Sequence, residues 1–345
     1  MNVLHWHIVD SNSFPFESKS FPLLHQKGAY STKEVYSASN IAELVKYAYD
    51  RGVRVIPEFD GPGHTYSWGM GYPNITTCPD SMPWNTYCYQ PPCGQLNPAF
   101  EETFTVVRGV LGDAAALFID DFFHLGADEV NIPCWETSES LSEWMVEQGL
   151  TDYTQVLQYY VTRVVDLARS FNKPAIFWQE VFADGLRFPN DTIIQIWLDS
   201  PTLHKVVTAG YRAILSNYQA WYLDCGFGNW MTGGDHSWCE PYKGWKTMYD
   251  NEPMPEGDDF DPALVLGGEA CMWGESTDDY NVDSKVWPRA AAVGERLWSS
   301  RDVNDSEEAF PRLDEHRERL VRRGISASIL RPKWCMLHPE NCPSY

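Results

Sequence analysis

Residues 122–130, with the sequence FFHLGADEV, decide how the rest of the chain is interpreted. A short apolar run ends at Gly126, and two adjacent carboxylates, Asp128 and Glu129, follow it. Parallel strands that are buried on both faces have apolar sequences of this kind, and in a (β/α) barrel the chemistry lies where the strands end. An isolated Asp-Glu pair is more often a solvated loop or the start of a helix. The other strand ends therefore decide between the two interpretations.

Seven apolar segments are predicted as strands, at residues 3–10, 53–58, 122–125, 175–177, 193–197, 212–215 and 264–267. Helices are expected at residues 40–51, with Asn40 as the cap, and near residues 99–111, 153–170, 202–209, 288–298 and 307–323. This alternation indicates a parallel sheet, and the predicted fold is α/β, a (β/α)8 TIM barrel. Because such a barrel has eight strands, we expect its first strand to be missing from this chain, before Met1.

The composition excludes several classes of partner. The chain has 345 residues, of which 48 are acidic and 26 basic, so its formal charge is −22. Such an acidic protein is not expected to bind nucleic acid or anionic membranes. No run of 18 apolar residues occurs, so no membrane-spanning helix is expected. The 15 Trp residues suit a site that stacks flat rings or sugar faces.

The cysteines indicate an oxidising compartment. Several of the nine Cys residues form close pairs in the sequence, at Cys88 and Cys93, Cys225 and Cys239, and Cys335 and Cys342. Asn-x-Ser/Thr sequons occur at Asn74, Asn190 and Asn304. Together these features favour the secretory pathway. No secretory signal is present, so we expect the true N-terminus to lie upstream of Met1.

Polar or aromatic residues stand at or just after the predicted strands. Along the chain they are Asp10, Glu58, Asp60, His64, Asp128, Glu129, Trp178, Trp197, Tyr222, Asp224, Glu269, Trp273 and Glu275. Each alone has an ordinary structural explanation, but so many on one barrel rim indicate a site. His5 and His7 could bind a metal, yet no motif supplies a third ligand, and no Gly-rich phosphate loop occurs. We therefore expect no metal and no cofactor, and we interpret the carboxylates and tryptophans as a site for glycoside hydrolysis.

At these residues the chain resembles the β-N-acetylhexosaminidases of glycoside hydrolase family 20, of the eukaryotic lysosomal or secreted type. The resemblance is carried, in the family's order, by residues 2–10 (NVLHWHIVD), 57–64 (PEFDGPGH), 124–130 (HLGADEV), 178–181 (WQEV) and 287–290 (WPRA). The Cys-rich segment at residues 78–93 and the loop at 225–239 resemble the chitin-degrading, arthropod-like branch.

The resemblance implies substrate-assisted, retaining hydrolysis, in which the 2-acetamido oxygen of the substrate attacks the anomeric carbon. Glu129 is then the general acid/base, and Asp128 holds the acetamido N–H and stabilises the oxazolinium-like intermediate. One carboxyl must be protonated while its neighbour stays charged. The resemblance also implies that Tyr222 hydrogen-bonds the acetamido oxygen and that Trp178, Trp197 and Trp273 pack around the sugar. Asp224 and Glu275 would bind sugar hydroxyls. The side chains that support Glu129 would be His64, Asp60 and Asp10.

The resemblance also implies which segments are missing from this chain, what it binds and where it is located. Family members carry an α+β domain and a first barrel strand with an Arg that grips the terminal sugar, and neither is present here. Residues 1–345 are thus expected to be a catalytic barrel that lacks both, and to be insoluble or inactive when expressed alone. The expected partner is a carbohydrate with terminal N-acetylhexosamine, with a homodimer possible, in the lysosome or outside the cell.

We expect eight of the nine cysteines to pair and Cys271 to be a free, buried thiol. The expected pairs are Cys78 with Cys134, Cys88 with Cys93, Cys225 with Cys239, and Cys335 with Cys342. Other pairings among Cys78, Cys88, Cys93 and Cys134 stay open.

Two alternatives to a family 20 hydrolase are considered. The first is a non-catalytic sugar-binding remnant, which the absent Arg allows and the intact Asp128-Glu129 pair disfavours. The second is a chitinase of the other acetamido-assisted family. The acidic motif of that family spaces its carboxylates two apart, whereas those of this chain are adjacent.

Overall fold

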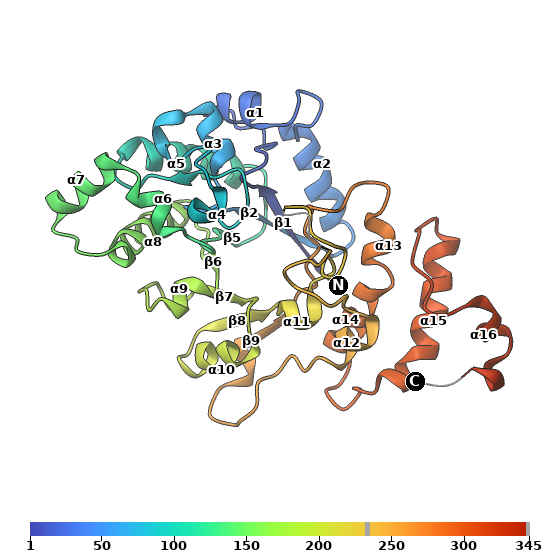
Figure 1. The fold of residues 1–345 in the computed structure, drawn as a ribbon. Helices are drawn as coiled ribbons and strands as arrows, with labels where there is room; N and C mark the ends of the chain where they lie inside the picture. Colours follow the sequence, from blue (N-terminus) through green and yellow to red (C-terminus); the bar gives the residue numbers. More distant parts are fainter. Residues whose placement is uncertain (232–234, 343–345) are drawn as a thin grey trace. The chain divides into compact units, whose positions relative to one another are not determined.

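The computed structural model describes residues 1–231 and 235–342. By contacts within the chain, it divides into two compact units, Met1–Gln195 and Ile196–Tyr345. Both units combine helices with parallel strands (Figure 1). Among the described residues, no helix has the length and apolar character needed to cross a membrane.

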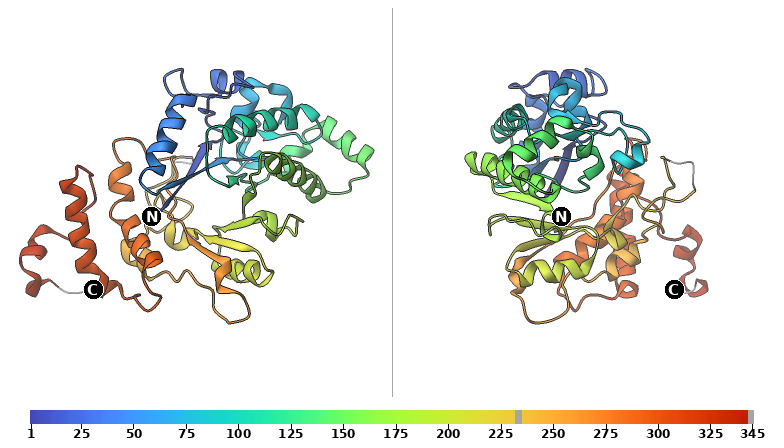
Figure 2. Two further views of the ribbon diagram at one scale, coloured as in Figure 1. Left: turned by 180° about the vertical axis from the view of Figure 1, so that it is seen from behind. Right: turned by 60° about the vertical axis from the view of Figure 1, so that its left-hand side comes forward.

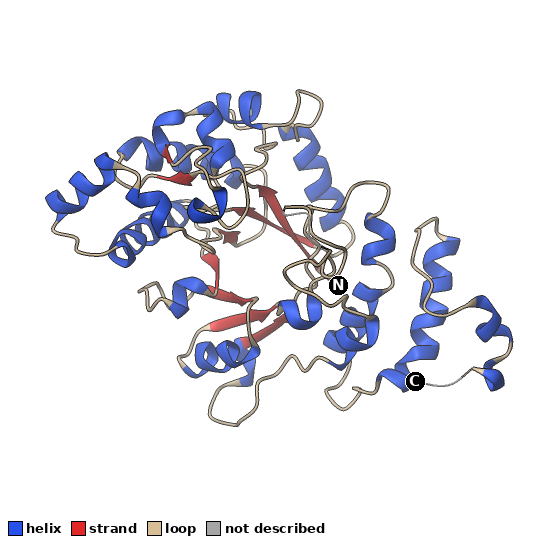
Figure 3. Cartoon of the chain, viewed as in Figure 1, coloured by secondary structure: helices blue, strands red, loops and turns tan. Residues whose placement is uncertain are grey.

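The first unit is built on parallel strands that neighbour one another in chain order. They are β1 (Val3–Val9), β2 (Arg54–Phe59), β5 (Phe123–His124), β6 (Ala175–Trp178) and all but the last residue of β7 (Ile193–Ile196). Their register aligns His7 of β1 with Glu58 of β2, and Glu58 with His124 of β5. The strands are short (red in Figure 3), so their carboxyl ends lead directly into loops. Three side chains that can ionise therefore share one row across the sheet.

Long amphipathic helices cover these strands. They are α2 (Ala38–Tyr49), α5 (Glu101–Ala115) and α8 (Tyr153–Ser170), and α5 packs beside α8 (Figure 2). One apolar stripe of α2 faces the core, where Ile41, Val45 and Ala48 are buried. Its predicted cap is wrong: the helix begins two residues earlier, where the Ser37 hydroxyl accepts the Asn40 N–H and the Asn40 side chain accepts the Ser37 N–H.

Shorter elements fill the connections of the first unit. The strands β3 (Thr76–Thr77) and β4 (Gln95–Leu96) form an antiparallel pair that the sequence analysis did not predict. The others are α1 (Leu23–Gly28), α3 (Tyr66–Gly71), η1 (Pro73–Ile75), α4 (Trp84–Tyr87), α6 (Ile132–Glu136), α7 (Glu139–Gln148) and α9 (Glu180–Ala183).

The second unit contains β8 (Arg212–Leu215) and β9 (Val265–Gly268), which pair in parallel. The Ser216 N–H donates to the carbonyl of Ile196, the last residue of β7, at 2.7 Å. Tyr249, Ala292, Ala309 and Leu313 form a core between three of its helices. The helices are α10 (Ser200–Thr208), α11 (Tyr218–Trp221), α12 (Trp245–Asp250), η2 (Pro262–Leu264), α13 (Val282–Val286), α14 (Arg289–Trp298), α15 (Ser306–Arg322), α16 (Lys333–Leu337) and η3 (Pro339–Asn341).

The predicted cysteine pairing is confirmed in full. Disulfides join Cys78 to Cys134, Cys88 to Cys93, Cys225 to Cys239, and Cys335 to Cys342. Cys271 is free and buried. Each of the seven predicted strands is also present within about two residues of its expected bounds.

Candidate active site

The loop after β5 turns sharply, and this turn presents the two adjacent carboxylates. Gly126, Ala127 and Glu129 all have positive φ, at 64°, 67° and 49°. A side chain at Gly126 would meet Asp60, because an added Cβ would lie 1.6 Å from the Asp60 Oδ1 atom. The same oxygen accepts the Ala127 N–H at 3.0 Å. Buried Asp60 therefore fixes the turn from below, and a glycine is required where the backbone approaches it.

His64 lies between three carboxylates of the first unit. Its Nε2 atom is 3.2 Å from Glu129 Oε2 and 3.8 Å from Asp128 Oδ2, and its Nδ1 atom is 3.8 Å from Asp10 Oδ1. Burial alone would lower the pKa of His64, but the hydrogen bond to Glu129 and the charges of Asp128 and Asp10 raise it well above its usual value. His64 is therefore a cation at neutral pH, and it holds the carboxylates together.

Asp128 is arranged to bind a hydrogen-bond donor. Burial raises the pKa of its carboxyl to about 7, the His64 cation lowers it, and the negative charge of Glu129 raises it again. Its Oδ1 atom is buried and has no hydrogen-bond partner among the described residues. Such an atom costs free energy unless a ligand satisfies it. Asp128 thus offers an acceptor to a polar N–H or O–H.

A second group of ionisable side chains lies beneath these carboxylates, and the sequence analysis did not single it out. Glu58 is fully buried, and three histidines surround it: His5, His7 and His124. Trp178, predicted to pack against the sugar, is itself buried and donates its indole N–H to Glu58 Oε1 at 2.8 Å. Side-chain nitrogen and oxygen atoms of His5, Glu58 and His124 lie within 4.8 Å of one another. The sequence analysis named Glu58 as a strand-end residue and His5 and His7 as possible metal ligands, but only the strand register groups them with His124.

The second unit gathers its own predicted aromatic residues. The rings of Trp197 and Tyr222 stack with centroids 6.4 Å apart, and Trp273 lies 6.2 Å from Tyr222. Trp238, which was not predicted, contacts Trp197 edge to face at 6.0 Å and is 58% exposed. An exposed indole beside stacked rings is suited to contact with a sugar face.

Asp224 stands next to this aromatic cluster in the sequence, two residues after Tyr222. Burial raises the pKa of its carboxyl to about 7, and the charge of exposed Glu275 acts in the same direction. The Asp224 Oδ1 atom is buried without a hydrogen-bond partner among the described residues. The second unit therefore also offers an acceptor atom.

Buried Arg289 of α14 holds the loop that carries Tyr222 and Asp224. Its guanidinium donates to the carbonyl oxygens of Leu223, between those two residues, and of Lys243 and Lys285. The bond to Lys243 measures 2.9 Å. On the other side of the loop, the Leu223 N–H donates to the Cys271 carbonyl at 2.8 Å. The loop is thus fixed through its backbone from two elements.

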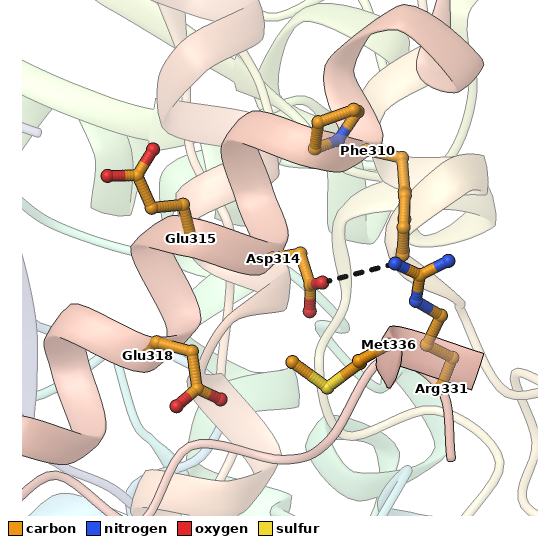
Figure 4. Close-up of a pocket in the computed structure, with 7 residues that line it drawn as sticks. Phe310, Asp314, Glu315, Glu318, Arg331 and Met336 are labelled. Carbon is orange, nitrogen blue, oxygen red and sulfur yellow. Dashed lines mark ion pairs between the residues drawn. The ribbon is translucent and has the colours of Figure 1, made fainter. Parts of the chain in front are cut away.

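A separate pocket lies between α15 and α16 of the second unit (Figure 4). Asp314 and Arg331 form an ion pair across it at 3.6 Å, and Glu315 and Glu318 stand on the same helix as Asp314. Phe310, Pro311 and Met336 complete its lining. None of the predicted site residues lies there.

Comparison with known proteins identifies the relatives of this chain. The model of glycosyl hydrolase family 20, catalytic domain, matches residues 1–301. A chitooligosaccharidolytic beta-N-acetylglucosaminidase of Ostrinia furnacalis is 39% identical over 361 residues, covering 100% of this chain and 60% of that protein. The beta-hexosaminidase subunit beta of Homo sapiens is 40% identical over 344 residues, covering 97% and 58%. The chain thus spans about 60% of the length of these relatives.

Solved structures agree with the sequence relatives. The chitobiase of Flavobacterium johnsoniae superposes with a TM-score of 0.79 at 27% identity, covering 94% of this chain and 48% of that one. An exo beta-N-acetylglucosaminidase of Vibrio harveyi, solved with N-acetylglucosamine, has a TM-score of 0.82 at 24% identity, covering 97% and 55%, and shows the fold alone. With the family match, these neighbours confirm the predicted α/β barrel class.

Proposed function

The chain belongs to glycosyl hydrolase family 20, and we propose that it is an exo-acting β-N-acetylhexosaminidase. It removes terminal N-acetylglucosamine or N-acetylgalactosamine from glycoconjugates or chitin oligomers. The observation that carries the proposal is the arrangement of Asp128 and Glu129 around His64, with the buried Asp128 Oδ1 atom left to receive a donor. Relatives named as β-N-acetylglucosaminidase and β-hexosaminidase support it.

The proposed first step breaks the glycosidic bond with the help of the substrate itself. The acetamido oxygen forms a bond to the anomeric carbon as the bond to the leaving oxygen breaks, and Glu129 gives its proton to that oxygen. Asp128 accepts the acetamido N–H through Oδ1 and, as a carboxylate, stabilises the positive oxazolinium ring. In the second step Glu129 takes a proton from water. The water oxygen bonds to the anomeric carbon as the bond from that carbon to the acetamido oxygen breaks, which opens the oxazolinium ring and leaves the sugar ring closed.

The remaining predicted residues receive supporting roles. We propose that Tyr222 bonds the acetamido oxygen and that Trp178, Trp197 and Trp273 pack around the acetamido group and the ring. Asp224 and Glu275 bind sugar hydroxyls, and the orphaned Asp224 Oδ1 atom supports this assignment. His64 and Asp10 support Glu129, and Asp60 holds the turn beneath it.

The setting of the enzyme is also a proposal. Residues 1–345 act as the catalytic barrel, in the lysosome or outside the cell, and the four disulfides support an oxidising compartment. A homodimer is proposed from the resemblance alone.

Hydrolysis of p-nitrophenyl N-acetyl-β-glucosaminide and galactosaminide tests the activity. The matched control is p-nitrophenyl β-glucoside, which lacks the acetamido group and so lacks the proposed nucleophile. In the full-length protein that contains residues 1–345, we expect turnover of the N-acetylated substrates only. Equal cleavage of the glucoside would contradict substrate assistance, and binding of N-acetylglucosamine without any hydrolysis would favour a sugar-binding remnant.

A further inference from the structure

The proposed reaction gives no role to the buried carboxylate of Glu58, whose side chain is 0% exposed. A charged carboxylate away from water requires several donors or cations. On one side, His7 Nδ1 lies 2.7 Å and His5 Nε2 3.0 Å from Oε2. On the other, Trp178 Nε1 donates to Oε1 at 2.8 Å and His124 Nδ1 lies 3.1 Å from it. Burial alone would raise the pKa of Glu58, but the charges of His124 and His7 hold it well below its usual value.

Strand register builds this arrangement. His7, Glu58 and His124 occupy paired positions on β1, β2 and β5. Side chains at paired positions on neighbouring parallel strands lie on the same face of the sheet. The group is therefore part of the sheet itself, beneath the loops that carry Asp128 and Glu129.

His7 bridges two carboxylates with its two ring nitrogens. Its Nδ1 atom lies 2.7 Å from Glu58 Oε2, and its Nε2 atom lies 2.9 Å from Asp10 Oδ2. A neutral imidazole has one N–H, so one carboxylate would face a lone pair, whereas the imidazolium donates to both. Burial lowers the pKa of His7, but Glu58 and Asp10 together raise it well above its usual value. His7 is thus a fixed cation.

The bridge continues to the proposed general acid. The two oxygens of Asp10 face different histidines: Oδ2 faces His7, and Oδ1 lies 3.8 Å from His64 Nδ1. His64 Nε2 is 3.2 Å from Glu129 Oε2. Burial alone would raise the pKa of Asp10, but the hydrogen bond from His7 and the charge of His64 lower it. Contacts between groups of opposite charge therefore run from Glu58 through His7 and Asp10 to His64, which lies beside the proposed acid Glu129.

We infer that His7 and Glu58 are positioning residues for the proposed reaction, because they keep Asp10 ionised and oriented toward His64, which in turn holds Glu129. The inference rests on the proposed function. Without the His7 cation, buried Asp10 accepts a proton at higher pH, and His64 then loses a negative neighbour. The other titratable groups whose charges or hydrogen bonds act on these residues are His5, Tyr30, Asp60, His124 and Asp128.

Two substitutions of His7 separate its two contacts. His7→Gln keeps an N–H near the Nε2 position, toward Asp10, but removes the charge. His7→Asn keeps an N–H near the Nδ1 position, toward Glu58, and removes the contact with Asp10. His204→Gln is the matched control, because His204 forms an exposed pair with Asp259 at 2.8 Å in the second unit, outside the proposed machinery.

We expect both His7 variants to lower kcat by roughly tenfold or more while KM changes by less than about threefold. The acid limb of kcat/KM moves to higher pH, and it moves further in His7→Asn. In an Asp10→Asn background, the same substitutions change kcat by less than about threefold, because their effect passes through Asp10. A wild-type pH profile in both variants, or an equal loss in the Asp10→Asn background, would overturn the inference.

Nitrogen NMR gives a measurement that does not depend on turnover. We expect the pKa of His7 to lie well above that of an ordinary histidine in the wild type, with both ring nitrogens protonated at neutral pH, and Asp10→Asn or Glu58→Gln to lower that titration midpoint. A neutral His7 at pH 7 would refute the bridge. If the wild type hydrolyses no N-acetylhexosaminide, the proposed function and the catalytic part of the inference both fail. The NMR titration still decides whether His7 holds Asp10 ionised.

Discussion

At the residue scale, the carboxyl of Glu129 carries the proposed proton transfer. Glu129→Gln keeps the shape of the side chain but cannot donate a proton, so we expect kcat to fall by about 10² to 10⁴. Binding of N-acetylglucosamine, measured by calorimetry, stays within a few fold. Glu139→Gln is the control, since this carboxylate lies in the first turn of α7. If Glu129→Gln kept more than half of the wild-type rate, another group would be the acid.

Asp128 should show a conflict between activity and stability. A carboxyl whose pKa is raised to about 7 by folding stabilises the fold at low pH, and that contribution is lost as pH rises through 7. Asp128→Asn removes this dependence. We expect its melting temperature to exceed that of the wild type at pH 8, by about 2–4 °C for each kcal/mol, and to match it near pH 4. Its hydrolysis of N-acetylated substrates falls, and it binds a thiazoline mimic of the intermediate more weakly. Equal melting curves at pH 8, or unchanged inhibition, would contradict the account.

At the scale of elements, α14 fixes the loop after β8 through one guanidinium. Arg289→Met keeps much of the packing volume but leaves three backbone carbonyls without their donor. Each buried unsatisfied group costs about 1–3 kcal/mol, so we expect a large loss of stability and faster amide exchange around Leu223. Arg312→Met, which breaks a half-exposed pair with Glu295, is the control and should cost about 1 kcal/mol or less. Equal effects of the two variants would mean that Arg289 does not hold the loop.

The helices and strands also show which features of the fold the sequence can predict. Apolar runs followed by polar residues indicated the seven strands and most of the rim, because burial and strand ends leave local patterns. The group around Glu58 left none, since its members come from strands 51 and 66 residues apart and meet only through register. The positive φ of Ala127 was equally hidden, because its N–H donates to Asp60, which is distant in the sequence. The cap of α2 was misplaced because Ser37 and Asn40 are both good capping residues, and geometry chose between them.

At the scale of the whole molecule, the disulfides differ in how much chain they constrain. Cys78–Cys134 spans 56 residues, whereas Cys88–Cys93 spans 5. In the chain-entropy account, a cross-link stabilises by restricting the unfolded state, and more so for a longer loop. That account gives about 4 kcal/mol for the first bridge and about 2 kcal/mol for the second. The long bridge also ties β3 and its surroundings to α6, which begins shortly after Glu129.

We therefore expect the double substitution Cys78→Ala with Cys134→Ala to lower the unfolding free energy by about 2 kcal/mol more than Cys88→Ala with Cys93→Ala. Both pairs belong to one cluster, in which Cys78, Cys134 and Cys93 are buried and Cys88 is half-buried, so the comparison chiefly tests loop length. Guanidinium titrations at pH 7 measure both variants. The long-bridge variant should also lose catalytic rate, because α6 is no longer tied to the segment after β3 and the turn that carries Glu129 loosens. If the short-bridge variant were the less stable of the two, the Cys88–Cys93 disulfide would act on the folded state, by packing, and not through the unfolded chain.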